Sequence, residues 1–476
     1  MQSVGTVLGD VLGLQLLMQF IEEEAGQFRD RVYSPMVTLG LFIEQVLSAD
    51  HSCQDAVARA LSARVAQGQA PSSLNTGPYC KARARLPLGL LERMGQEVGR
   101  GLCVGQPATW RWRNREVKLV DGTVVSMPDT RANQARFPQN HQQSAGLGFP
   151  LARAVAIISL SCGAVLQWAV GPCEGKETGE TALLWGLAHK LVRGDVVVID
   201  RCYAGYFMLA WLMHWGVDVV VRQHQRRHTD FRQGKRMGAR DHVVHWDRPQ
   251  RPAWMDAATY AAMPQSLLLR EVRSAGWTLV STPPDAKEVS KRELLDLYRL
   301  RWQVELDFRS IKAVMQMDIL RCKTPQMVCK EIAAHLLAYN LVRAVMARAA
   351  YLSAVLPRQL SFKGALQVLR AFEENLRHSP HGRLEIRHAH VLAGIAQMRL
   401  PERPGRVEPR VVKRRPKPHR LLTEPRHILR QRLLQQQQRH TEAFYWSPTP
   451  FVVAPASPHP AIPCRKCSNE QAAHGM

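Results

Sequence analysis

The sequence lacks an uninterrupted hydrophobic run long enough to cross a membrane. Its longest apolar stretch, residues 154–170, is broken by serine, glycine and glutamine, whereas a membrane-spanning helix needs about 20 apolar residues. This stretch instead predicts two buried strands that turn near Gly163. Because no basic segment precedes an apolar run at the N-terminus, no export signal is expected. We therefore expect a cytoplasmic protein without a membrane partner.

Cysteine is present but forms no recognisable pattern. The ten cysteines are scattered along 476 residues, and this spacing does not resemble the disulfide framework of a small secreted domain. Cys464 and Cys467 have the spacing of one half of a zinc site, but no second pair accompanies them. We therefore expect reduced thiols and interpret this pair as part of a C-terminal tail.

Common nucleotide and zinc motifs are also missing. The glycine-rich segment at residues 171–180 lacks the spacing of a phosphate-binding loop, and Glu177 after Lys176 would repel phosphate. The eighteen histidines include no HExxH pair. Four of them lie in a basic, strand-like stretch between residues 224 and 245, where surface roles are the default. The sequence thus disfavours a P-loop nucleotidase and a zinc peptidase.

Acidic residues are few relative to basic ones. Lysine and arginine number 64 against 40 aspartates and glutamates, which gives a net charge of +24. Such an excess favours a polyanionic partner. DNA, RNA and an anionic membrane would all satisfy the charge, and the absence of an apolar span makes the membrane the weakest of the three.

Two predicted strands each end near an aspartate. Asp121 lies in the apolar segment 116–125 and is followed by Gly122, and Asp200 comes directly after the run of valine and isoleucine at residues 196–199. An ionised carboxylate beside a buried strand is costly unless a cation compensates it. These two positions are therefore candidates for cation binding.

A third carboxylate lies on a predicted helix with neighbouring cations. Tyr298, Arg301, Glu305 and Lys312 fall within roughly 60° of arc at about 100° per helical residue. Asp307 points to the opposite face by the same geometry. An ordinary solvated helix is the alternative for any one of these residues. Two aspartates and a glutamate that converge, however, are the ligands that a pair of hard divalent ions prefers for phosphoryl chemistry.

These residues resemble a known family. The order Asp121, Asp200, Glu305, with the spacing Y-x2-R-x3-E-x6-K around the glutamate, is similar to the DDE transposases of bacterial insertion sequences with the Y-R-E-K signature, the insertion-sequence-four family. The segments DGTVVSMPDT, GLGFP, EGKETGE and DRCYAGY also resemble that family. The resemblance covers roughly residues 117–317.

The resemblance implies an α/β fold with an RNase H-like catalytic core. In such a core a mixed sheet carries Asp121 on its first strand and Asp200 after its fourth, and a following helix carries Glu305. The 104 residues between Asp200 and Glu305 exceed what the core needs, which matches the β-rich insertion of this family. We expect a helical DNA-end-binding domain (1–110), the first part of the core (115–217), the insertion (218–285), the second part of the core (286–350), a helical region (351–400) and a basic, proline-rich tail (401–476).

Local patterns accompany this division. Periodic apolar segments predict helices before residue 110, for which a plain helical bundle is the alternative to a DNA-binding domain. Ser290 and Glu293 form a capping box that predicts the start of the signature helix. Residues 401–440 contain twelve lysines and arginines against three glutamates. Their prolines favour an extended basic arm on DNA, with a solubilising tail as the alternative.

The resemblance also implies a function for each candidate residue. Asp121, Asp200 and Glu305 would be the catalytic residues and would hold two Mg²⁺ ions, for which Mn²⁺ could substitute. Double-stranded DNA, as transposon end and as target, would be the partner of a homodimer in the synaptic complex. Cleavage would proceed through a hairpin intermediate in a nucleoid-associated protein.

Several DNA contacts follow from the same resemblance. Tyr298, Arg301, Arg309 and Lys312 would hold the DNA backbone, and Trp277 would stack on a base flipped out of the transposon end. A core tryptophan is the alternative for Trp277.

Two other functions fit the charge and the carboxylates less well. One is a different RNase H-like nuclease, such as a resolvase, and the other is a DNA-binding regulator derived from a transposase. The regulator is disfavoured because a pure binder has no use for three carboxylates that face phosphates. Short inverted repeats beside the reading frame would separate a transposase from both.

Overall fold

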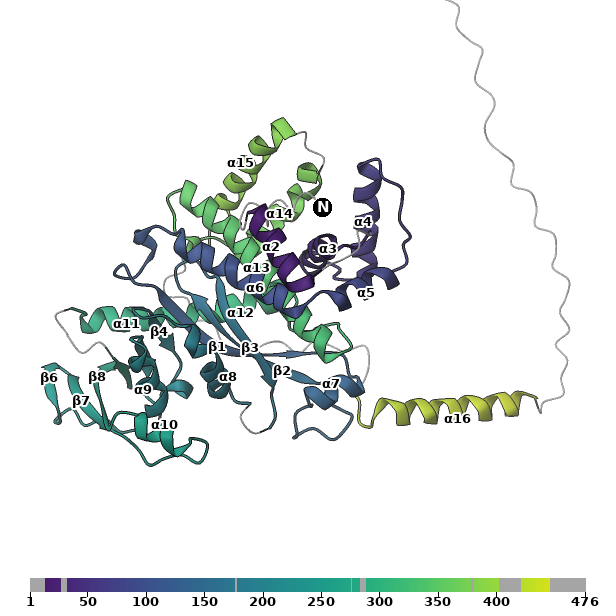
Figure 1. Ribbon diagram of the computed structural model, residues 1–476. Helices are drawn as coiled ribbons and strands as arrows, with labels where there is room; N and C mark the ends of the chain where they lie inside the picture. The colour runs from purple at the N-terminus through teal and green to yellow at the C-terminus, as the bar shows by residue number, and fades with distance from the viewer. Residues whose placement is uncertain are drawn as a thin grey trace, which may run out of the picture. The chain divides into compact units, whose positions relative to one another are not determined.

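The computed structural model describes residues 13–26, 32–175, 178–274, 276–282, 288–377, 381–401 and 421–445 (Figure 1). The chain divides into two compact units, Met1–Pro416 and Lys417–Met476. Across the described ranges, no helix has both the length and the apolar character that crossing a membrane requires. The eight cysteines in these ranges are free thiols.

The first part of the chain is helical. Its helices begin at residues suited to helix starts, because the side chains of Ser34 and Ser52 accept hydrogen bonds from the first-turn amides of Val37 and Asp55. Pro35 follows the first of these caps, where a missing N–H costs nothing. The helices are α2 (Leu14–Ala25), α3 (Pro35–Leu47), α4 (Cys53–Ala66), α5 (Gly77–Arg85) and α6 (Leu88–Val104).

A mixed sheet follows these helices. Its first five strands are β1 (Val117–Ser126), β2 (Leu151–Ser159), β3 (Val165–Pro172), β4 (Val196–Ile199) and β5 (Asp218–Arg222), in the order β3-β2-β1-β4-β5. β2 is antiparallel to β1 and β3, whereas β4 and β5 run parallel to β1. The predicted hairpin turn is confirmed, with Gly163 at φ 79° between β2 and β3. The sheet fits the RNase H-like core that the resemblance implies.

The predicted β-rich segment extends this sheet and forms no separate layer. The remaining strands are β6 (Lys235–Gly238), β7 (Asp241–Asp247), β8 (Ser266–Ser274) and β9 (Trp277–Ser281). β9 pairs antiparallel with β5, so the order continues as β5-β9-β8-β7-β6 and gives one nine-stranded sheet. β5 itself pairs with β4 and belongs to the core strands.

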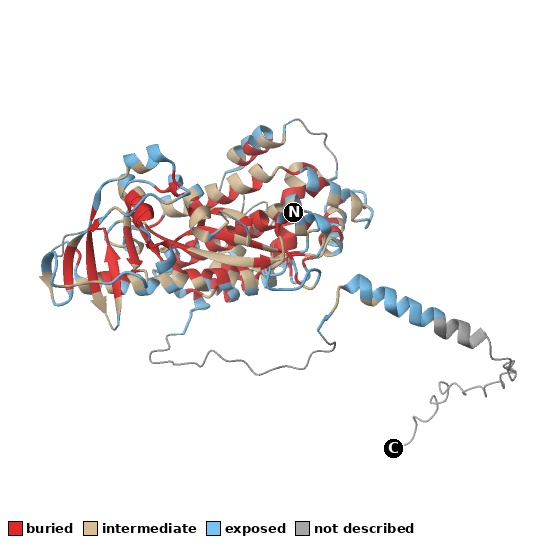
Figure 2. Cartoon of the chain, turned by 90° about the horizontal axis from the view of Figure 1, so that it is seen from below, coloured by how far each residue is buried: buried red, intermediate tan, exposed pale blue. Residues whose placement is uncertain are grey.

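Both faces of the sheet are covered, and its strands are mostly buried (Figure 2). Side chains alternate between faces along each strand. Leu119 of β1 and Val198 of β4 pack in the cluster that contains α6 and α13 (Pro325–Leu352). Val120 and Val197 pack on the other face, with α8 (Glu180–Leu187) and α9 (Tyr206–His214).

The remaining elements belong to the first unit, except for α16, which lies in the second. The helices are α7 (Arg131–Arg136), α10 (Ala257–Ala262), α11 (Lys291–Arg299), α12 (Gln303–Arg309), α14 (Phe362–Arg377), α15 (His381–Gln397) and α16 (Arg426–Tyr445). Short 3-10 turns occur at Ala108–Trp110, Ala188–Lys190, Arg201–Tyr203, Leu300–Trp302 and Pro357–Gln359, and a π turn at Ser310–Val314.

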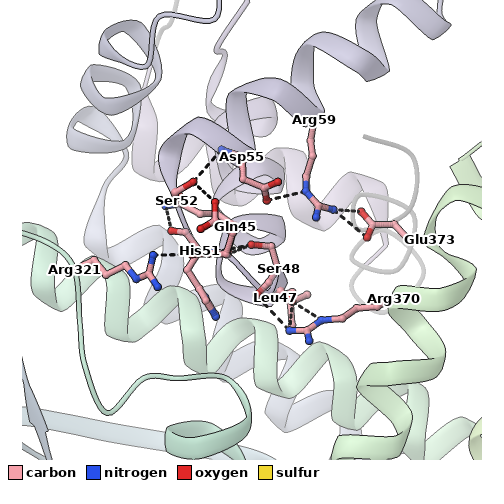
Figure 3. A network of polar contacts seen from close by, with 11 residues as sticks. Gln45, Leu47, Ser48, His51, Ser52, Asp55, Arg59, Arg321, Arg370 and Glu373 are labelled. Atoms are coloured by element: carbon pink, nitrogen blue, oxygen red, sulfur yellow. Dashed lines mark hydrogen bonds and ion pairs between the residues drawn. The ribbon is translucent and has the colours of Figure 1, made fainter. Parts of the chain in front are cut away.

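The turn between α3 and α4 joins the first helices to the later ones (Figure 3). Arg321 donates a 2.6 Å hydrogen bond to the carbonyl oxygen of Asp50, and Arg370 of α14 donates one of 2.6 Å to that of Leu47. Hydrogen bonds from charged donors are stronger than neutral ones. The first helices therefore lie in the same compact unit as the sheet.

A pair of buried histidines lies at the same turn. The rings of His51, in the turn, and His335, on α13, stack with centroids 6.2 Å apart. Burial, together with the nearby His335, Arg321 and Arg370, lowers the pKa of His51 to about 4. Burial also lowers the pKa of His335. Both rings are therefore neutral at physiological pH.

The tail contains a helix where an extended arm was expected. That expectation is wrong over α16, because residues 426–445 contain no proline or glycine and are rich in glutamine, leucine and arginine, which favour helices. Most of the described residues of α16 are exposed (Figure 2). The prolines at 404–418 and the pair Cys464 and Cys467 lie outside the described residues.

Candidate active site

Asp121 lies on β1 where the pairing with β4 ends. The last paired residues are Val120 of β1 and Ile199 of β4. The Oδ1 atom of Asp121 accepts a 2.8 Å hydrogen bond from the backbone N–H of Gly122. Burial raises the pKa of Asp121 to about 6, with the charges of Glu180 and Asp200 adding to the rise and the Gly122 N–H and Arg301 opposing it. This carboxylate therefore lies in a negative, poorly solvated environment.

Asp200 lies beside it in the parallel register. It directly follows β4 and keeps an extended backbone at φ −79° and ψ 164°. Because Val120 pairs with Ile199, Asp121 and Asp200 are the next residues on two adjacent parallel strands, and such strands are about 4.8 Å apart. Side-chain alternation places both on the face of Leu119 and Val198, where α13 packs. The sheet thus brings the two predicted aspartates together.

The signature segment is not the single regular helix that the spacing argument assumed. The capping box of Ser290 and Glu293 is confirmed at the start of α11. α11 then passes through the 3-10 turn Leu300–Trp302 into α12 and ends in the π turn Ser310–Val314. Each residue of a 3-10 turn rotates the side-chain direction by about 120°, which is more than in an α-helix, whereas each residue of a π turn rotates it by less. The two turns therefore shift the side-chain directions in opposite senses.

Arg301 connects two of the predicted carboxylates. Its Nη1 atom lies 3.3 Å from Oδ2 of Asp121, and its Nη2 atom lies 2.9 Å from Oε1 of Glu305. Burial lowers the pKa of Arg301, but the neighbouring Tyr298, Asp121 and Asp200 and the hydrogen bond to Glu305 outweigh burial and raise it. The structure therefore brings Asp121, Asp200 and Glu305 around one guanidinium.

Two other predicted cations differ in their surroundings. Lys312, in the π turn, donates a 2.8 Å hydrogen bond from Nζ to the carbonyl oxygen of Val124 on β1. Arg309 is exposed and borders a cavity of about 260 Å³ whose lining contains Asp307 and none of the three predicted catalytic carboxylates. Lys312 therefore lies against β1, the strand that carries Asp121, whereas Arg309, the last residue of α12, lies at that cavity.

Trp277 lies next to Tyr298. It is the first residue of β9 and is partly buried, and its ring centroid is 5.5 Å from that of Tyr298. The guanidinium of Arg222 lies 5.9 Å from the Trp277 ring. Burial raises the pKa of Tyr298 to about 12, so its hydroxyl stays protonated. The structure brings together the tryptophan and the tyrosine that the resemblance assigns to the transposon end.

Asp307 is separated from the site, as the helical geometry predicted. It is fully buried, and its Oδ1 atom lies 2.6 Å from Nη2 of Arg343 and 2.6 Å from Nη1 of Arg358. The hydroxyl of Tyr339 donates a third hydrogen bond of 3.0 Å. This network, which the sequence did not indicate, fixes α12 against α13.

Glu180 is a neighbouring carboxylate that the sequence argument missed. Tyr203 donates a 3.3 Å hydrogen bond to its Oε2 atom. A Cβ atom on Gly122 would lie 2.5 Å from the Glu180 carboxyl, so a larger residue at this position would displace the end of the Glu180 side chain. Glu180 belongs to the EGKETGE segment and Tyr203 to DRCYAGY, two segments that resemble the family but whose sequence does not indicate this contact.

The donor set fits a hard divalent metal, although its present arrangement does not. Asp121, Asp200 and Glu305 offer the carboxylate oxygens that Mg²⁺ and Mn²⁺ prefer, and a cation would relieve the buried charge of Asp121. Within the described ranges, however, no three histidine, cysteine, aspartate or glutamate side chains lie close enough together to hold one ion. The guanidinium of Arg301 binds two of these three carboxylates.

Comparison with known proteins decides the family. Residues 112–341, which include all three carboxylates, match the family described as Transposase DDE domain. The chain is also 29% identical over 347 residues to the transposase InsG of insertion sequence element IS4 from Escherichia coli K12, covering 68% of this chain and 75% of that one. The chain is a DDE transposase of the IS4 family. The family predicted from the sequence is thus confirmed.

Other matches of the transposase are partial or distant. It is 39% identical over 71 residues to the transposase of insertion sequence element IS421 from Escherichia coli, which covers 15% of this chain and 19% of that one. A solved structure of the piggyBac transposase synaptic complex with hairpin DNA matches with a TM-score of 0.42 and 9% identity, over 85% of this chain and 87% of that chain.

Membership of the family establishes a general activity. The transposase is an enzyme that binds DNA, cleaves it and catalyses strand transfer. Enzymes of this class use divalent metal ions to cleave and form phosphodiester bonds.

Proposed function

We propose that Asp121, Asp200 and Glu305 are the catalytic residues of the transposase and hold two Mg²⁺ ions, for which Mn²⁺ can substitute. The observation that carries this proposal is their arrangement. Asp121 and Asp200 lie side by side at the ends of two adjacent parallel strands. Arg301 forms ion pairs with both Glu305 and Asp121. When bound, two ions between such carboxylates activate the attacking oxygen and stabilise the leaving one.

The DNA is held by the remaining signature residues. Arg301, Arg309 and Lys312 contact the phosphates of the transposon end, because cations pair with phosphate oxygens through strong charge-assisted hydrogen bonds. The protonated hydroxyl of Tyr298 donates a hydrogen bond to the same backbone. Arg301 and Lys312 support this role most directly, since both lie beside β1 near Asp121. Arg309 lies farther along the segment and reaches a neighbouring part of the backbone.

Trp277 stacks on a base flipped out of the transposon end. Its position at the start of β9 beside Tyr298 supports this role, because the base and its phosphate would then be held by adjacent side chains. An aromatic face accepts any base, and stacking is worth about 1 to 3 kcal/mol per base. This gain offsets the cost of unstacking the flipped base when the strand folds back to form the hairpin.

The transposase acts as a homodimer on two ends. Transposition joins both ends of one element, so a synaptic complex of two copies supplies one active site for each end. The net charge of +24 supports extensive phosphate contacts and association with the nucleoid. The first helices, α2–α6, contribute recognition of the end sequence.

Isosteric substitution of the carboxylates tests the proposal. Asp121→Asn, Asp200→Asn and Glu305→Gln should each lower Mg²⁺-dependent nicking of terminal-repeat DNA by more than about a hundredfold, because metal catalysis supplies several kcal/mol. DNA binding in a gel-shift assay should be nearly unchanged, since the basic surface supplies most of the affinity.

The control is a carboxylate on the same segment outside the centre. Asp296 of α11 is about half exposed and pairs with Arg299, so Asp296→Asn should nick DNA at the wild-type rate. Substantial nicking by Asp200→Asn would remove Asp200 from the catalytic set and overturn the proposal.

A further inference from the structure

Arg301 lies where a metal ion would be expected. Its guanidinium donates to Oδ2 of Asp121 and to Oε1 of Glu305, and its side chain is only 16% exposed. Asp200 is also near enough for its charge to act on Arg301. One fixed cation therefore compensates the carboxylates that are proposed to bind metal.

A guanidinium and a metal ion compete for the same oxygens. Arginine keeps its proton in proteins, so the charge of Arg301 cannot be removed by deprotonation. A divalent ion that entered while Arg301 held both carboxylates would have to displace a partly buried ion pair and would be repelled by its charge. Metal binding to this arrangement should therefore be weak.

A DNA phosphate offers Arg301 another partner. Arginine binds phosphate through two parallel hydrogen bonds, with the same fork of donors that now binds two carboxylates. We infer that Arg301 is a positioning residue that blocks the metal site of the free transposase until a phosphate of the transposon end takes its guanidinium. The inference rests on the proposed function.

This exchange makes metal binding and DNA binding cooperative. If end DNA raises the metal affinity by some factor, the metal raises the affinity for that DNA by the same factor, since the two equilibria are linked. The metal also reduces the repulsion between carboxylates and phosphates, which contributes cooperativity without Arg301. The part of the cooperativity that depends on Arg301 is the difference in cooperativity between the wild type and a variant that lacks the guanidinium.

The experiment measures Mn²⁺ affinity with and without DNA. The amplitude of the electron paramagnetic resonance signal of free Mn²⁺ gives the affinity of the full-length protein, alone or with a duplex of the terminal repeat that flanks the reading frame. Arg301→Ala should raise the Mn²⁺ affinity of the DNA-free protein by about tenfold or more, which corresponds to about 1.4 kcal/mol. It should also reduce the enhancement that DNA causes.

A neighbouring arginine supplies the matched control. Arg299 carries the same charge on the same segment, pairs with Asp296 and has a 70% exposed side chain. Arg299→Ala should leave the Mn²⁺ affinity nearly unchanged, which separates a local block from a general loss of positive charge. If Arg301→Ala does not fold, Arg301→Gln removes the charge and keeps a hydrogen-bond donor.

The outcomes separate this inference from the proposed function. An unchanged or lower Mn²⁺ affinity in folded Arg301→Ala or Arg301→Gln would overturn the block, even if Asp200→Asn and Glu305→Gln abolish both Mn²⁺ binding and nicking. If those carboxylate variants bind Mn²⁺ and nick DNA like the wild type, the proposed metal centre itself fails. A rise in affinity limited to the Arg301 variants supports the inference.

Discussion

Two acidic residues of the signature segment, Glu305 and Asp307, have opposite surroundings. Glu305 is partly exposed and contacts Arg301, whereas Asp307 is fully buried between Arg343 and Arg358. The sequence predicted this difference from helical geometry alone, because residues two positions apart lie on nearly opposite faces. It could not predict the partners of Asp307, which come from parts of the chain 36 and 51 residues away.

Asp307→Asn should strongly destabilise the fold. Removing one partner of a buried ion pair leaves uncompensated charge and costs about 3 to 5 kcal/mol. Urea unfolding followed by circular dichroism should show a lower midpoint than for wild type. Glu305→Gln, on the same segment, should change the midpoint little. Equal stability of the two variants would show that Asp307 is not the structural centre of this network.

Trp277→Ala should separate the two steps of end cleavage. The first nick does not need a flipped base and should proceed at nearly the wild-type rate, whereas hairpin formation should slow about tenfold or more, because stacking is worth about 1 to 3 kcal/mol. A transposon end that lacks the flipped base should partly restore the variant, since less unstacking is required. Nicked and hairpin products are followed over time on both ends.

The opposite pattern would assign Trp277 to the core. Its partial burial beside Tyr298 is compatible with packing alone. If Trp277→Ala slows both steps equally and the abasic end gives no relief, its role is structural.

At the scale of elements, the turn between α3 and α4 should make stability depend on pH. The pKa of His51 falls from 6.5 to about 4 on folding. Because the folded pKa is depressed, the stability linked to His51 is present above pH 6.5 and is lost as the pH falls toward 4. The difference corresponds to at most about 3 kcal/mol, and His335 acts in the same direction.

His51→Asn should flatten this dependence. Asparagine tolerates the positive φ of 59° at this position and does not titrate. When the pH is lowered from 7 to 4, the midpoint temperature of thermal unfolding should fall less for His51→Asn than for the wild type. His228→Asn, at an exposed histidine, should keep the wild-type slope. Parallel slopes for all three proteins would mean that the histidine pair does not control docking of the turn.

Regular elements were predictable where local chemistry determines them. The hairpin at Gly163 and the capping box of Ser290 follow from residues adjacent in sequence. The 3-10 and π turns around α12 were not predictable, because they depend on contacts with β1 such as that of Lys312 with Val124. The positions of Asp121 and Asp200 at adjacent strands required the parallel register, which only the family resemblance implied.

At the scale of the whole molecule, the basic tail should contribute affinity without sequence preference. Truncation after Pro401 keeps the hydrogen bond from the backbone N–H of Leu400 to the carbonyl oxygen of Gln359 and removes residues 402–440, which carry a net +9, with the rest of the tail. Binding should weaken about equally for specific and random duplexes, and the slope of log affinity against log salt should become shallower. Filter binding across a salt series measures both.

A charge-neutral tail is the matched control for length. Replacing the lysines and arginines of residues 403–439 with glutamine should reproduce the truncation. An unchanged salt slope in both proteins would favour a solubilising tail.

Composition predicted the nucleic-acid partner, because charge is a property of the whole chain. It could not predict that the insertion continues the core sheet. That continuity depends on β9 pairing with β5, although 54 residues separate Trp277 from Arg222, the last residue of β5. Long-range strand pairing of this kind leaves no local pattern.

The continuous sheet limits how the transposase can be recombined with its relatives. Since β4 pairs with β5 and β5 with β9, Trp277 and the end of the strand before Asp200 belong to one hydrogen-bonded sheet, which fixes the proposed stacking residue relative to the proposed aspartates. A graft that exchanges β6, β7 and their loops leaves this alignment intact, whereas a graft that includes β9 resets it. The interchangeable module is therefore smaller than the insertion.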